Sequence, residues 1–189
     1  LLNNFDGENA PEGNWVSPSY QETLTSGVTS LTGGLYRNLI AEAEKRIGEL
    51  KAMGYTVHIK GLYWMQGESD IGRVINGGIQ NEYKNAFKFF VSDVRADLGK
   101  IAGADLSSMP VYVGQVSVTA NSDTSGNPQK FIDMQNTLSE IPGVYIIQSG
   151  QYKLGSAYDS GCYDMWHWSY SSQLAIGNLV GEKILEVMG

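Results

Sequence analysis

The chain has 189 residues but only one cysteine, two histidines and five prolines, and it contains no long hydrophobic run. A single thiol, Cys162, cannot close an internal disulfide or build a zinc site from four cysteines, so we expect it to be structural or incidental. The longest apolar runs are a few residues, whereas a helix that crosses a bilayer needs about 20. The polar sequence after Leu1 has neither region of a signal peptide, so we expect a mature or trimmed N-terminus.

Basic residues are also scarce, with 13 Lys and Arg against 20 Asp and Glu, which gives a formal charge of -7. No cluster of Lys or Arg is present that would follow a phosphate backbone or an anionic lipid surface. We therefore expect neither nucleic acid nor a membrane as a partner. The length and the hydrophobic content of 42% fit a single domain, residues 1–189, with one core.

Helix and strand patterns alternate along most of the chain. Residues 1–33 show no period and are expected to be irregular, whereas apolar residues recur every three or four positions from Gly34 to Met53 and predict a helix. Further helices are predicted around residues 83–98, from 127 onwards and at 170–188, and strands at 57–65, 111–118 and 144–148. This order predicts a parallel sheet with helices on both faces and a ligand site at the carboxyl ends of the strands.

Two polar segments contain the residues that can perform chemistry. The first is WMQGESD, residues 64–70, which follows the first predicted strand, and the second is DMWH, residues 164–167, directly before the last helix. In the second, Asp164 is placed to accept the Nδ1 hydrogen of His167 and leave Nε2 as a general base. The same spacing also fits an aspartate that caps a turn beside a half-buried histidine. Ser69 and Asp70, in the first segment, are expected to cap the helix or turn that follows.

WMQGESD closely resembles the W-x-Q-G-E-x-D block of the sialate O-acetylesterase and acetylxylan esterase group of SGNH hydrolases, and DMWH resembles the closing D-x-x-H block. The order of the blocks matches over about residues 34–189. The resemblance implies a flavodoxin-like three-layer α/β/α sandwich that removes acetyl groups from carbohydrates such as acetylxylan or acetylated sialic acid, without metal or cofactor. It implies that His167 is the base, Asp164 its orienting partner and Gln66 an oxyanion-hole donor. Gly67 belongs to the same block, and Glu68 is expected to have a supporting role.

The family's nucleophile block, Gly-Gln-Ser-Asn after the first strand, is not found in this sequence. None of the serines before Gly33 follows an apolar strand in a glycine-framed turn; they include Ser17, Ser19, Ser26 and Ser30. Only three strands are predicted, fewer than the roughly five of a doubly wound domain. We therefore expect a separate N-terminal segment or chain to carry the serine and complete the fold. Such proteins are expected to be secreted or periplasmic.

Other interpretations of these residues remain open at the level of sequence. A diverged member of the family would be inactive and would only bind glycan. Ser69 is the one internal substitute for the missing nucleophile. A metal-dependent hydrolase would use Asp164, His167 and Glu68 as a mixed ligand set. Gln115 is a second candidate at the sheet rim, and His58, in the first predicted strand, is expected to be structural.

Overall fold

The computed structural model describes residues 15–23, 33–120, 125–152, 154 and 167–189. The chain divides into two compact units, of which the first comprises residues 1–61 and 81–110 and the second residues 62–80 and 111–189. Within the described residues, the first unit is helical and the second contains the sheet. A single-domain organisation stays a prediction.

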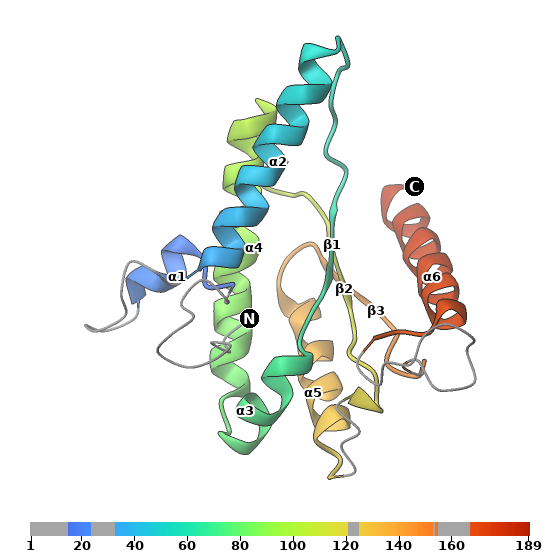
Figure 1. The fold of residues 1–189 in the computed structure, drawn as a ribbon. Helices are drawn as coiled ribbons and strands as arrows, with labels where there is room; N and C mark the ends of the chain where they lie inside the picture. Colours follow the sequence, from blue (N-terminus) through green and yellow to red (C-terminus); the bar gives the residue numbers. More distant parts are fainter. Residues whose placement is uncertain (1–14, 24–32, 121–124, 153, 155–166) are drawn as a thin grey trace. The chain divides into compact units, whose positions relative to one another are not determined.

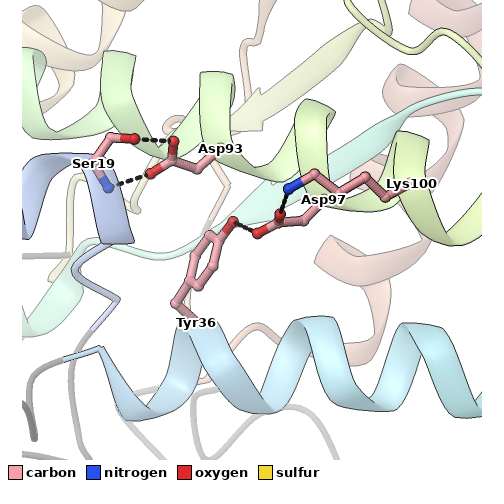
Figure 2. Close-up of polar contacts among 5 residues, drawn as sticks. All are labelled: Ser19, Tyr36, Asp93, Asp97 and Lys100. Atoms are coloured by element: carbon pink, nitrogen blue, oxygen red, sulfur yellow. Dashed lines mark hydrogen bonds and ion pairs between the residues drawn. The ribbon is translucent and has the colours of Figure 1, made fainter.

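The first unit is built around two long helices, α2 (Gly34–Ala52) and α4 (Gln80–Ala102). All of α4 except its first residue, Gln80, belongs to this unit. Both were predicted from their apolar periodicity, and the structure confirms them. The core of the unit is aromatic, because the fully buried ring of Phe90 stacks on Phe87 and meets Trp15 and Tyr36 edge to face. The phenol of Tyr36 donates a hydrogen bond to Asp97 Oδ2 at 2.8 Å (Figure 2), so burial and this bond raise its pKa.

The prediction that residues 1–33 are irregular is wrong over Pro18–Thr23, which form the short helix α1. Figure 2 shows that Ser19 donates to both oxygens of Asp93 on α4, through its backbone N–H at 2.9 Å and its hydroxyl at 2.6 Å. The first turn of α1 is thus satisfied by a carboxylate 74 residues away in the chain. A local sequence pattern contains no sign of such a distant partner.

The second unit contains three parallel strands in the order β1-β2-β3, namely β1 (Leu62–Met65), β2 (Val111–Gly114) and β3 (Val144–Ile147). β2 is buried along its whole length, as expected for a strand covered on both faces. The predicted parallel α/β arrangement is confirmed. Among the described residues, β1 pairs with β2 only.

The first two strands are shorter than predicted. β1 begins at Leu62 rather than at residue 57, because the register that pairs Leu62 with Val111 would place Gly61 beside Pro110, which has no N–H to donate. His58 therefore lies outside the strand, where its side chain is exposed. β2 ends at Gly114 rather than at residue 118, because the backbone N–H of Val116 donates to the side chain of Gln135.

Two helices of the second unit lie on opposite sides of the strands in Figure 1, α5 (Asn127–Asn136) and α6 (Tyr170–Met188). This is the three-layer α/β/α order that the sequence resemblance implies. α5 begins with Pro128 in its first turn, and the hydroxyl of Ser169 caps α6 by accepting from the N–H of Ser172 at 3.1 Å. Shorter elements are η3 (Glu68–Asp70), α3 (Ile71–Asn76) and η5 (Thr137–Glu140). None of the helices in the described ranges has the length and hydropathy to cross a bilayer.

Candidate active site

The first polar segment lies at the carboxyl end of β1, the edge of the sheet where the alternation of strands and helices predicted a site. Gln66 follows the last residue of the strand, and the chain then turns through η3, where the N–H of Asp70 donates to the carbonyl of Gly67 at 2.8 Å. The turn brings Gln66 and Asp70, the first and last residues of the loop, next to each other. α3 begins immediately after it.

Gly67 is required by its backbone and by the space around it. Its φ of 152° is one that residues with a side chain rarely adopt. A Cβ at this position would lie 2.6 Å from Cε1 of Phe131 on α5 and 3.0 Å from a methyl of Val116. Only glycine lets the loop between Gln66 and Asp70 lie this close to α5.

The Gln66 side chain is held by a buried acid. Its Nε2 donates to Oδ2 of Asp70 at 3.0 Å, and Asp70 has no exposed surface. Asp70 occupies the N-cap position of α3, but its side chain makes no capping bond to that helix. The prediction that the Asp70 side chain caps α3 is therefore wrong. The carboxylate accepts a hydrogen bond from Gln66 instead.

Glu68 lies close enough to Tyr63 on β1 to act on its phenol. Burial, and in second place the charge of Glu68, raises the pKa of Tyr63 to about 12. The phenol lies over Gly114 of β2, where a Cβ would come within 2.7 Å of its oxygen. Glu68 is thus a half-buried carboxylate whose negative charge acts on the phenol of Tyr63 in β1. Its supporting role in the site stays a prediction.

His167 is exposed and directly precedes Trp168, whose backbone forms an isolated antiparallel bridge with Leu154. Leu154 follows a loop that is tied to the end of β2. In that loop, Gly150 donates its N–H to Gln115, and the carbonyl of Tyr152 accepts from the hydroxyl of Ser117 at 2.8 Å. The backbone next to His167 is therefore connected to the sheet rim. Asp164, its predicted partner, lies outside the described residues.

A buried apolar cluster involves the residue before Gln66 and the residue after His167. Leu154, Trp168 and Ile176 form a buried apolar cluster, against which Met65, Tyr152 and Val180 pack. Met65 directly precedes Gln66, and Trp168 directly follows His167. Gln66 and His167 are thus each one position away from a residue of this packed group, which joins two segments that lie about 100 residues apart in sequence.

Gln115 proves to be a structural residue of the rim. It is almost fully buried, and its amide donates to Asn136 at 2.7 Å and to Gln148 at 3.1 Å while its oxygen accepts from the N–H of Gly150. These bonds leave it little capacity for a ligand. Gln135, which sequence analysis did not single out, has a similar role, because it bonds the N–H of Val116 and the carbonyl of Gly114.

The remaining candidates are placed as follows. Ser69 is exposed in η3, in the same turn as Glu68. Ser17 is buried and Ser19 bonds to Asp93, both in the first unit, where the described residues form no strand. No three His, Cys, Asp or Glu side chains gather as metal ligands in the part of the chain that the structure describes, and the proposed ligand Asp164 lies outside that part. Cys162, Ser26 and Ser30 also lie outside it.

Comparison with known protein families shows where the chain belongs. A family model described as carbohydrate esterase, sialic acid-specific acetylesterase matches residues 15–186. This range contains both polar segments and most of each compact unit. No curated protein and no solved structure matches the chain.

Proposed function

Because this chain belongs to the sialic acid-specific acetylesterase family of carbohydrate esterases, we propose that its rim residues hydrolyse acetyl esters on sugar hydroxyls by a Ser-His-Asp mechanism. The observation that supports the proposal most directly is the apolar cluster that contains Trp168 and against which Met65 packs, because these two residues are the direct neighbours of Gln66 and His167 in sequence. An amide donor and an imidazole at one rim are the groups that acyl transfer to a serine requires.

In the proposed mechanism, His167 Nε2 removes the proton of the serine hydroxyl while the serine oxygen attacks the acetyl carbonyl. The carbonyl oxygen becomes an oxyanion, to which the Gln66 amide donates a hydrogen bond. The intermediate collapses, the bond to the sugar oxygen breaks, and the imidazolium protonates that oxygen. Water, deprotonated by His167, then attacks the acetyl-serine. The bond to the serine oxygen breaks, the imidazolium returns its proton to that oxygen, and the acetic acid released ionises to acetate. Asp164 accepts the Nδ1 hydrogen and stabilises the imidazolium.

We propose that the nucleophilic serine lies on a segment other than residues 1–189. The sequence has no Gly-Gln-Ser-Asn block, and β1 has room for a further strand, because its described pairing is with β2 alone. The last helix also presents apolar side chains outwards, Leu174 at 55% and Leu185 at 75% exposure. A further strand and the helix that follows it would cover both features.

The substrate to test first is O-acetylated sialic acid, because the description of the family names sialic acid. Acetylxylan is the second, since the sequence resembles a group that includes acetylxylan esterases. Both present a sugar hydroxyl as the leaving group, and the proposed chemistry is the same for each.

The test uses the full-length protein that contains these residues, with an aryl acetate as substrate. His167→Ala is expected to lower kcat about 10⁴-fold or more, because the serine loses its base. Gln66→Ala is expected to lower kcat about 10²- to 10³-fold with little change in KM. Gln129→Ala, which changes an exposed amide on α5, is the control.

Activity of His167→Ala within tenfold of the parent would remove His167 from the mechanism. A parent protein that binds acetylated glycan but releases no acetate would contradict the enzyme and support a binding function. If Ser69→Ala abolishes hydrolysis, the nucleophile lies inside this chain.

A further inference from the structure

We propose that Ser117 is a positioning residue for the base, because its buried hydroxyl holds the loop whose backbone pairs with the residue after His167. This inference rests on the proposed function of His167 as the general base. Its structural basis is the hydrogen bond that Ser117 Oγ donates to the carbonyl of Tyr152 at 2.8 Å. Two residues further along the chain, Leu154 forms the backbone bridge to Trp168.

A general base in a loop needs such an anchor. Proton transfer requires the imidazole to lie within hydrogen-bond reach of the hydroxyl that it deprotonates, and a displacement of about 1 Å can lower a rate about 10²-fold. His167 is exposed and lies outside the helices and strands that the structure describes. Its backbone position therefore depends on the contacts of its neighbours in the chain.

The bridge beside His167 is an isolated backbone pair, so both of its sides must be fixed from elsewhere. Even a complete two-stranded hairpin is only marginally stable by itself. On one side, Trp168 is followed by the Ser169 cap and by α6, and its side chain lies in the buried cluster with Ile176. On the other side, Leu154 is reached from β3 through a loop, and that loop requires an anchor of its own.

The loop after β3 is anchored on the segment that follows β2. Its first part is held by hydrogen bonds of 2.8 to 3.1 Å that Ser149 and Gly150 make with Gln115 and Val118. The bond from Ser117 to Tyr152 comes last along the loop and lies nearest to the bridge at Leu154. Ser117 thus joins the end of β2 to the backbone that pairs beside the base, across 35 residues of sequence.

The hydrogen bonds of the Ser117 hydroxyl permit a single arrangement. A carbonyl oxygen can only accept, so the one hydroxyl proton of Ser117 points at Tyr152. Its oxygen then accepts from Thr119, whose hydroxyl lies 2.9 Å away and whose backbone N–H donates at 3.2 Å. The side chain has no exposed surface, so water does not compete for these bonds. Ser117 therefore holds Tyr152 with a donor whose direction is fixed.

The chain contains two matched controls for this residue. Ser139 Oγ donates to the carbonyl of Asn136 at 2.7 Å, which is the same kind of bond, but it is exposed and joins residues only three positions apart. Ser117→Ala and Ser139→Ala therefore remove the same hydroxyl from a long-range bond and from a local one. Thr119→Val removes a neighbouring hydroxyl and leaves the bond from Ser117 to Tyr152 in place.

The first measurement does not depend on activity. In hydrogen–deuterium exchange of the full-length protein, followed by mass spectrometry, we expect Ser117→Ala to exchange faster in the peptides that contain Leu154 and Trp168, while α5 exchanges as in the parent. Ser139→Ala and Thr119→Val should leave both regions unchanged. Unchanged exchange at the bridge in Ser117→Ala, or an equal increase in α5, would overturn the inference, whether or not the protein is an esterase.

The second measurement is kinetic and uses conditions under which circular dichroism shows every variant to be folded. We expect Ser117→Ala to lower kcat on an aryl acetate about tenfold or more with KM unchanged, and the two controls to change neither. In the background of His167→Ala, Ser117→Ala is expected to have no further effect on kcat, because the base through which it acts is gone. An equal loss in both backgrounds would show that Ser117 does not act through His167, and would overturn the inference. A parent with no esterase activity contradicts the proposed function, while the exchange at the bridge still decides whether Ser117 holds it.

Discussion

Met65 packs against the buried apolar cluster that contains Trp168, so the residue before Gln66 and the residue after His167 belong to one packed group. Trp168 also forms the backbone bridge to Leu154. Trp168 therefore packs through its side chain and pairs through its backbone. Both interactions hold the backbone next to the proposed base, although Trp168 performs no chemistry itself.

Trp168→Ala in the full-length protein is expected to lower the free energy of unfolding by about 3 to 5 kcal/mol, because it leaves a cavity in this cluster. The turnover of an aryl acetate should fall as well, since His167 loses its support. Chemical denaturation and initial rates measure the two effects. Tyr170→Ala, two residues along and 70% exposed, should change stability by no more than about 0.5 kcal/mol. Equal stability of the two variants would contradict the role of the cluster.

Gly67→Ala and Gly72→Ala should have opposite effects. At Gly67, the φ of 152° and the ring of Phe131 both oppose a methyl group, so we expect a loss of about 2 kcal/mol or more in stability. At Gly72, within α3, a Cβ meets nothing within 4 Å, and alanine should stabilise by about 0.5 to 1 kcal/mol. Thermal unfolding of both variants decides this. A neutral Gly67→Ala would show that the loop relaxes freely.

The alkaline titration of Tyr63 tests the proximity of Glu68. The pKa of Tyr63 is raised from an ordinary 10.0 to about 12, so this phenol stays protonated in the folded protein at a pH where the unfolded chain ionises. Its contribution to stability is therefore constant below about pH 10 and is lost as the pH rises towards 12. We expect Glu68→Gln to lower the Tyr63 pKa, and ¹³C-labelled tyrosine measures it by NMR. An unchanged pKa would mean that Glu68 lies too far away to act on the phenol.

The helices could be predicted from the sequence because their signal is local. The apolar spacing from Gly34 predicts α2 nearly to its observed end, and α6 begins and ends at the predicted residues. The strands were predicted less well, since the start of a parallel strand depends on its partner. Pro110, which lies about 50 residues further along the chain, ends the pairing that Val57 and Ile59 indicate.

The candidate site was predicted in its residue types but not in its connections. Gln66, Gly67 and Glu68 do lie at the carboxyl end of a strand, which follows from the alternation of helix and strand. The bond between Gln66 and Asp70 depends on a turn with a positive φ at Gly67, and such a turn has no periodic signal. Likewise, the cluster that joins Met65 to Trp168 forms only when the whole unit has folded.

The exposed apolar side chains of α6 test whether a further segment completes the fold. Leu185 is 75% exposed in these 189 residues, and Gln129 on α5 is also exposed. If a segment beyond residues 1–189 packs on α6, Leu185→Lys in the full-length protein should cost about 1.5 to 3 kcal/mol, the value for a buried leucine. Gln129→Ala, which lies on another helix, should cost no more than about 0.5 kcal/mol. Chemical denaturation of the two variants measures the difference. Small losses in both would mean that α6 is as exposed in the full-length protein as it is here, and the nucleophile would then have to be sought within the chain, beginning with Ser69.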